Sequence, residues 1–175
     1  MNSLSKLFVV ALLLTLISCS SKIQRPQDGT ANYAYGGEKY GNVELTVNKD
    51  ATEDPNDIVR FDDKKLQEMI KKKLDVSGLI DEKEISKIKV EITDIRIRSS
   101  FNAFMWGVMA GNDHIRGDVS LLNDDGNTIY KFHVSASYAL GGFAGFNETR
   151  MSWLFEEFSK LTLEEIKGEQ IARND

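Results

Sequence analysis

The sequence predicts an α+β domain in which two helices cover one face of a small mixed sheet of about four strands. Four segments alternate apolar and polar residues, as half-buried strands do. These segments are residues 43–47, 88–97, 115–121 and 130–138. Two further segments, starting near residues 62 and 147, repeat apolar residues at helical spacing. Their order of strand, helix, strand, strand, strand, helix favours a parallel pair across the first helix and antiparallel neighbours after it.

The first strand and helix are marked by their flanking residues as well as by their periodicity. The strand at 43–47 leads into a polar turn that contains Pro55. Asp62 is the expected N-cap of the helix, and Phe61 can pack on its first turn as a hydrophobic staple. Gly78 provides an end for the helix. The apolar face of this helix consists of Leu66, Met69, Ile70 and Leu74.

The second strand changes the phase of its alternation. Its apolar positions have even numbers up to Ile92, whereas Ile95 and Ile97 have odd numbers. Successive side chains of a strand point to opposite faces of the sheet. Either the strand therefore changes its buried face, or a β-bulge near Thr93 and Asp94 resets the register.

The third and fourth strands are expected to form a hairpin around residues 123–127, where Asn-Asp-Asp-Gly-Asn has the composition of a tight turn. One face of the third strand is apolar and includes Gly117. Its other face carries His114, Arg116, Asp118 and Ser120. The inner face of the fourth strand consists of Tyr130, Phe132, Val134, Ala136 and Tyr138.

The last helix is expected to begin near Asn147 or Thr149 and to end at Gly168, just after Lys167. A broad apolar stripe at helical spacing indicates that it packs on the sheet. This stripe consists of Met151, Leu154, Phe155, Phe158, Leu161 and Ile166.

Two apolar segments fall between the strands rather than on them. Residues 101–111 precede the third strand, and residues 139–146 follow the fourth. In an antiparallel hairpin the start of one strand lies beside the end of the other, so both segments should meet opposite the hairpin turn. They either fold inward and close the core, or form an exposed patch for a protein partner or a membrane. The candidate partner surface consists of Phe101, Phe104, Met105, Trp106, Met109, Phe143 and Phe146.

The amino terminus has the pattern of a secretory signal. Lys6 precedes an unbroken apolar stretch over residues 7–17, which is too short to span a bilayer. The run Leu-Ile-Ser-Cys that ends at Cys19 resembles the lipobox of bacterial lipoproteins at each position. The resemblance implies cleavage before Cys19, a fatty acyl chain such as palmitate on this residue and, because Ser20 follows, sorting to the periplasmic side of the outer membrane. The alternative is an ordinary signal peptide with an incidental cysteine.

We expect a single domain of periplasmic α+β type, preceded by a lipid-anchored flexible tether. The tether lacks apolar periodicity, and its Tyr33, Tyr35 and Tyr40 dock on the domain, on a partner or on neither. The expected divisions are a lipoprotein signal peptide at 1–18, the tether at 19–42, the domain at 43–168 and a frayed tail at 169–175.

Charge and missing motifs exclude several functional classes. The formal net charge of −5 is unsuited to nucleic acid, which requires concentrated Lys and Arg. Acylation of Cys19 would remove the sole thiol, and with it any disulfide or cysteine metal site. The sequence contains no phosphate loop, Rossmann fingerprint or Gly-x-Ser-x-Gly elbow. We therefore expect neither an enzyme nor a cofactor.

Two histidines keep a metal site and a hydrolase open as alternatives. His114 and His133 fall on neighbouring strands, where Asp118 can join them as a third ligand. The other interpretation is that they are ordinary solvent-facing strand residues. Asp113 and His114 can instead form a catalytic pair, although no nucleophile with a partner completes that set.

Several features together resemble an uncharacterised domain-of-unknown-function family of bacterial lipoproteins, over roughly residues 43–167. They are the lipobox, the strand at 90–97, Ala110-Gly111, the Asp125-Gly126 hairpin and the closing aromatic helix. The element order is also similar to that of small periplasmic α/β domains. Examples are the amino-terminal domain of TolB, the activators of penicillin-binding proteins and the core of the curli secretion lipoprotein. These resemblances imply a partner in envelope machinery rather than an enzyme.

The sequence thus predicts an outer-membrane-anchored periplasmic lipoprotein that acts as a non-enzymatic interaction or assembly module. Its partners would be the membrane, through lipid on Cys19, and an envelope protein. The alternative is a carrier of a lipid or glycan fragment, held between helices and sheet in a cavity lined by Phe155, Phe158 and Tyr138.

Overall fold

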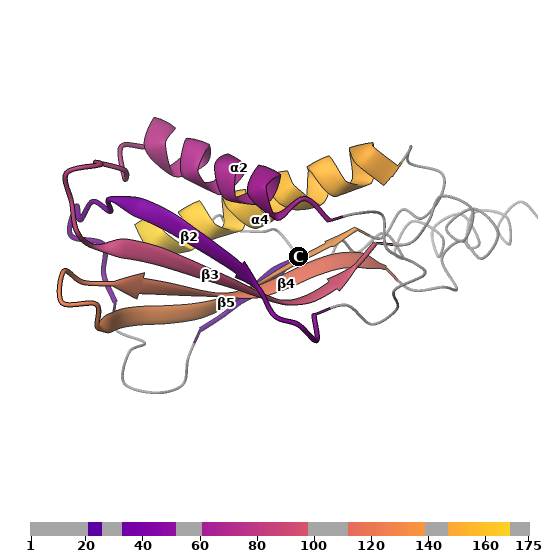
Figure 1. Cartoon of the computed structure of the whole chain (residues 1–175), viewed down its shortest axis with the longest axis horizontal. Coiled ribbons are helices and arrows are strands. Elements are labelled where there is room, and N and C mark those ends of the chain that lie inside the picture. The colour runs from indigo at the N-terminus through magenta and orange to yellow at the C-terminus, as the bar shows by residue number, and fades with distance from the viewer. Residues whose placement is uncertain (1–20, 26–32, 52–60, 98–111, 139–146, 169–175) are drawn as a thin grey trace, which may run out of the picture.

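The described part of the chain forms one five-stranded sheet covered on one face by two helices (Figure 1). The computed structural model describes residues 21–25, 33–51, 61–97, 112–138 and 147–168. The elements in these residues are β1 (Lys22–Gln24), β2 (Asn42–Val47), α2 (Asp63–Val76), β3 (Lys87–Arg96), β4 (Asp113–Leu122), β5 (Thr128–Tyr138) and α4 (Asn147–Lys167). Across the sheet the strands follow the order β1-β5-β4-β3-β2.

The sheet is mixed, as the sequence predicts. β2 and β3 are parallel, with Val43 opposite Ile88, and α2 connects them. The other neighbouring pairs are antiparallel. The predicted number of about four strands is too low, because β1 adds a fifth at the edge of β5, with Lys22 opposite Ser135. A strand of three residues is too short to show alternation, so only its backbone pairing reveals it.

The helices begin and end where their sequence signals indicate. The side chain of Asp62 accepts a hydrogen bond from the backbone N–H of Lys65 at 3.0 Å and caps α2. Gly78, just beyond α2, has a φ of +75°, a conformation that glycine adopts without strain. The ring of Phe61 is half-buried and meets that of Phe155 edge-on at 5.5 Å, so it joins the two helices. The predicted apolar stripe of α4 is buried throughout.

A β-bulge accounts for the change of phase in β3. The register against β4 shifts between Ile92, which lies opposite Gly117, and Asp94, which lies opposite Arg116. The additional residue, Thr93, returns Ile95 to the face that packs on the helices, where it is 1% exposed. Of the two alternatives that the sequence left open, the bulge is the one that occurs.

Part of the segment expected to be a flexible tether belongs to the folded domain. Besides β1, Tyr40 is buried in the core, and its backbone exchanges hydrogen bonds with Leu79 and Asp81. Tyr33 stacks on Tyr130 with ring centroids 4.8 Å apart. The expected tether boundary at residue 42 is therefore wrong, because isolated tyrosines dock through tertiary contacts that have no local periodicity.

A buried carboxylate on α4 attaches the chain after β1 to the rest of the fold. Arg25 donates two hydrogen bonds to Glu165, from Nε at 2.6 Å and from Nη2 at 2.9 Å. The hydroxyl of Tyr130 donates to the same carboxylate. Burial raises the pKa of Glu165, but the hydrogen bonds from Arg25 and Tyr130 outweigh this effect and hold it below its ordinary value.

This carboxylate predicts a loss of stability in acid. Because the pKa of Glu165 is lowered on folding, its contribution is complete above its ordinary value near 4.5. The contribution decreases as the pH falls below that value and is gone below the lowered pKa of the folded state. Glu165→Gln should weaken the dependence of unfolding free energy on pH in this range, as measured by urea titration, whereas Glu68→Gln on the exposed face of α2 should not. Identical pH profiles for the wild type and Glu165→Gln would contradict the assignment.

Candidate functional site

The uncovered face of the sheet collects charged side chains because of its register. Across β3 and β4, Asp94 lies opposite Arg116 and Arg96 lies opposite His114. An uninterrupted β3 would point Asp94 toward the helices, so the bulge at Thr93 brings it and Arg96 to this outer face. The sequence places His114 and Arg116 on one face of β4, but their partners depend on the bulge.

The same face contains a polar hollow of about 530 Å³ over β1, β5, β4 and the end of β3. Small side chains form its base on β5, where Ser135 and Ser137 are 5% and 7% exposed. Longer side chains on the neighbouring strands surround them. We call this the outer-face hollow, and its lining consists of Lys22, Gln24, Arg96, Asn112, His114, Arg116, His133, Ser135 and Ser137.

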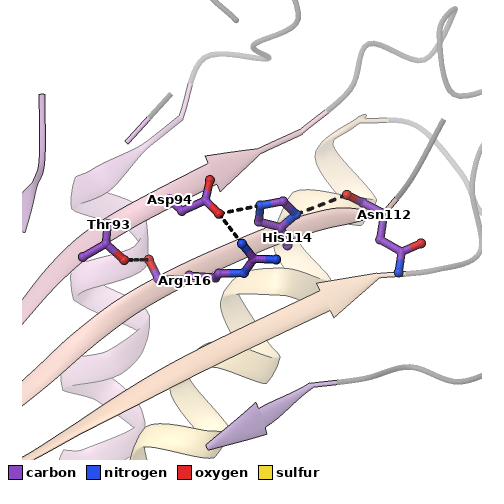
Figure 2. A network of polar contacts seen from close by, with 5 residues as sticks. All are labelled: Thr93, Asp94, Asn112, His114 and Arg116. Carbon is purple, nitrogen blue, oxygen red and sulfur yellow. Dashed lines mark hydrogen bonds and ion pairs between the residues drawn. The ribbon is translucent and has the colours of Figure 1, made fainter. Parts of the chain in front are cut away.

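Asp94 holds two of these side chains in place, as Figure 2 shows. Its Oδ2 lies 2.6 Å from Nη1 of Arg116 and 2.9 Å from Nε2 of His114. The other ring nitrogen of His114, Nδ1, lies 3.3 Å from the backbone oxygen of Asn112. Both ring nitrogens of His114 thus face oxygen atoms. Thr93 donates to the backbone oxygen of Arg116 at 3.4 Å and links the bulge to this network.

The second histidine has a different carboxylate partner. Nδ1 of His133 lies 2.8 Å from Oδ1 of Asp118, whose other oxygen pairs with Lys131 at 2.9 Å. Burial raises the pKa of Asp118, but the hydrogen bonds from His133 and Lys131 outweigh this effect and hold the pKa below its ordinary value. The ion pair with Asp118 in turn raises the pKa of Lys131.

The metal site of His114, His133 and Asp118, which the sequence left open as an alternative, is not assembled. His133 lies opposite Asp118 and His114 lies opposite Ser137, which separates the histidines by four residue positions, or about 13 Å, along the strand pair. Within the described residues, no group of three His, Cys, Asp or Glu side chains is arranged to hold a metal ion. The sequence places these three residues on one face of the sheet. The strand register, however, gives each histidine a different carboxylate partner, Asp94 for His114 and Asp118 for His133.

The predicted pair of Asp113 and His114 is also divided, because successive strand residues point to opposite faces. Asp113 points toward the helices, where it forms an ion pair with Arg150 of α4, and both side chains are fully buried. This ion pair attaches the end of β4 that carries His114 to α4. This buried pair and the outer-face network therefore occupy adjacent backbone positions on opposite faces of the sheet.

The candidate partner surface and Cys19 lie outside the described residues. The residues that flank the two apolar segments, 101–111 and 139–146, are described, and they lie together. Arg96 at the end of β3 is opposite His114, and Asp113 at the start of β4 is opposite Tyr138 at the end of β5. Both apolar segments therefore start or finish at one end of the sheet, which we call the loop end.

The three side chains predicted to line a ligand cavity between helices and sheet are buried in the core. Phe155 and Phe158 are fully buried, and Tyr138 packs on Trp153 with ring centroids 5.0 Å apart. Two further hollows border the hairpin turn and the outer faces of β2, β3 and β4, and they are lined by other residues. In the described part of the chain, no helix is long and apolar enough to cross a membrane.

A sequence profile described as "Domain of unknown function (DUF4410)" matches residues 27–142. The chain belongs to the DUF4410 family. This membership confirms the resemblance to an uncharacterised domain family that the sequence indicates. No curated protein sequence matches the chain.

Two solved structures resemble this DUF4410 protein at low identity. A leucine-to-methionine variant of the PelC dodecamer from Paraburkholderia phytofirmans has a TM-score of 0.48 and 10% identity, and the alignment covers 82% of this chain and 96% of that chain. A second PelC dodecamer structure from the same organism has a TM-score of 0.47 and 12% identity, with 84% and 97% covered. Likenesses of this size do not assign a function.

The buried ion pair makes a prediction about stability. Asp113→Leu removes the carboxylate that Arg150 contacts in the interior, and breaking a buried pair on one side destabilises by about 3–5 kcal/mol. The double variant Asp113→Leu/Arg150→Met replaces both charges with apolar groups and should recover most of that loss. Urea unfolding of Asp113→Leu, Arg150→Met and the double variant provides the measurement. If the double variant is as unstable as the sum of the single ones, the pair does not act as a unit.

Proposed function

We propose that this protein is an envelope lipoprotein whose domain is held close to the periplasmic surface of the outer membrane by lipid on Cys19. In this proposal it is a non-enzymatic interaction module, and the loop end of the sheet is its contact surface. The observation that carries the proposal is the direction of the edge strand β1, whose amino-terminal side lies beside the carboxyl end of β5.

The direction of β1 relates the expected lipid to the loop end. β1 is antiparallel to β5, with Gln24 opposite His133 and Lys22 opposite Ser135. Following the chain backward therefore leads toward the end of β5, where the hydroxyl oxygen of Ser21 accepts a hydrogen bond from the backbone N–H of Ser137 at 3.2 Å. Ser21 itself is 6% exposed. The amino-terminal side of β1 thus points to the loop end.

Covalent geometry limits how far the lipid can lie from this point. Cys19 is two positions before Ser21 in the chain, and neighbouring Cα atoms are about 3.8 Å apart, so the Cα of Cys19 is within about 8 Å of the Cα of Ser21. Both apolar segments start or finish at the same end. These facts support a domain that lies directly at the membrane with its loop end facing the bilayer, rather than a domain held on a long tether. A tethered surface needs only weak contacts, because its effective concentration near other envelope proteins is high.

The lipid itself is tested by mass spectrometry and fractionation. The native protein should carry acyl groups on an amino-terminal Cys19 and partition with membranes. Cys19→Ser, produced without residues 1–18, should lose the acyl groups and leave the membrane fraction, because both the lipid and the apolar signal are then missing. Ser20→Ala serves as the matched control and should retain both. An unmodified cysteine in the native protein would remove the basis of the proposal.

The orientation is tested with fluorescent probes on the lipidated protein in vesicles. Asn112→Cys labels the loop end and Asp125→Cys labels the hairpin turn, about 30 Å away along β4. A quencher carried on lipid headgroups should quench the label at residue 112 several-fold more strongly than the label at residue 125. Equal quenching, or the reverse order, contradicts the seated orientation even if the lipid is present.

A further inference from the structure

We infer that the outer-face hollow binds the phosphate group of an anionic ligand. This inference is independent of the lipid on Cys19 and concerns described residues only. Three of the lining side chains carry formal positive charge, Lys22, Arg96 and Arg116, and two more are histidines. Among the described residues the lining contains no carboxylate, although the chain as a whole has a net charge of −5. Positive charge is thus concentrated in this hollow against the overall balance of the protein.

The register places two cations on either side of a small residue. On the outer face Ser135 of β5 lies between Arg116 of β4 and Lys22 of β1, its partners in the two neighbouring strands. Two strand spacings of about 4.8 Å separate β4 from β1, which leaves about 10 Å between the two backbones. Both long side chains line the hollow above the buried Ser135. A phosphate between them can accept from a guanidinium on one side and an ammonium on the other.

Asp94 lies beside the hollow and orients the guanidinium of Arg116 without neutralising all of the positive charge there. Asp94 uses Oδ2 for both Nη1 of Arg116 and Nε2 of His114. Among the described residues the remaining guanidinium nitrogens of Arg116 have no hydrogen-bond acceptor, and its side chain is 47% exposed. The guanidinium therefore keeps donors for a ligand while one edge is fixed. Even with Asp94 counted, the two cations Lys22 and Arg116 exceed this one carboxylate among the described residues.

The other lining groups favour a phosphate over a planar carboxylate. Hydroxyls of Ser135 and Ser137, the amide of Gln24 and the ring of His133 lie on two strands around the same space. A tetrahedral phosphate has oxygens for donors that approach from several directions, whereas a carboxylate matches a single planar fork. The volume of about 530 Å³ exceeds that of a bare phosphate and lies in the range of small-ligand sites. The ligand is therefore a phosphate monoester or diester, supplied by a soluble metabolite or by a lipid headgroup.

The test measures binding to the purified full chain in neutral detergent. Inorganic phosphate and glycerol 3-phosphate are the soluble probes, with binding followed by calorimetry. Vesicles of phosphatidylcholine with and without phosphatidylglycerol are the headgroup probes. Binding is followed by flotation of the Cys19→Ser protein produced without residues 1–18, so that neither the lipid nor the apolar signal contributes. Binding of the soluble probes alone assigns a soluble ligand, and selective binding of the anionic vesicles assigns a headgroup.

Two substitutions separate the site from general charge effects. Lys22→Gln and Arg116→Gln should each weaken binding about tenfold, the loss expected for one charge-assisted hydrogen bond. Lys89→Gln is the matched control, because Lys89 lies on the same face of β3 outside the hollow. Lys22 makes no ion pair among the described residues, so its variant tests the site even if Arg116→Gln fails to fold. Failure of all probes to bind, or equal loss in Lys22→Gln and Lys89→Gln, would overturn the inference.

Discussion

The β-bulge at Thr93 is the constraint on which both faces of the sheet depend. It lets Ile92 and Ile95 point to the same side, so that β3 presents a continuous apolar surface to the helices. It also directs Asp94 outward beside β4. Gly117 lies opposite Ile92 at this position, and a Cβ there would approach the backbone oxygen of Glu91 to 2.8 Å. Position 117 therefore requires glycine, because a Cβ there would force β3 and β4 apart.

The edge of the sheet is stabilised by side chains rather than by strand length. β1 has three residues, too few to be stable through backbone pairing alone. Arg25 is fixed by the buried carboxylate of Glu165, and Ser21 bonds the end of β5. These contacts make the amino-terminal segment part of the domain. Its direction, rather than the flexibility of a tether, then decides where anything attached ahead of it would lie.

Carboxylates in this domain organise cations at specific positions. Asp94 and Asp118 each hold a histidine and a basic side chain on the outer face, while Asp113 holds Arg150 in the interior. Strand alternation sends the neighbours Asp113 and His114 to opposite faces. As a result, charge of one sign collects in the outer-face hollow, although the protein carries more acidic than basic residues.

The sequence by itself determined the element types and nearly all of their positions. Alternation, helical spacing and caps such as Asp62 are local properties, and even the bulge left its signal in the phase of Ile92 and Ile95. Only the tertiary structure decided which side chains meet. The strand β1, the docking of Tyr40 and the separate carboxylates of the two histidines all depend on register and packing between segments far apart in the chain. Local periodicity carries no information about such pairing, because the same alternating strand can lie beside different neighbours at different registers.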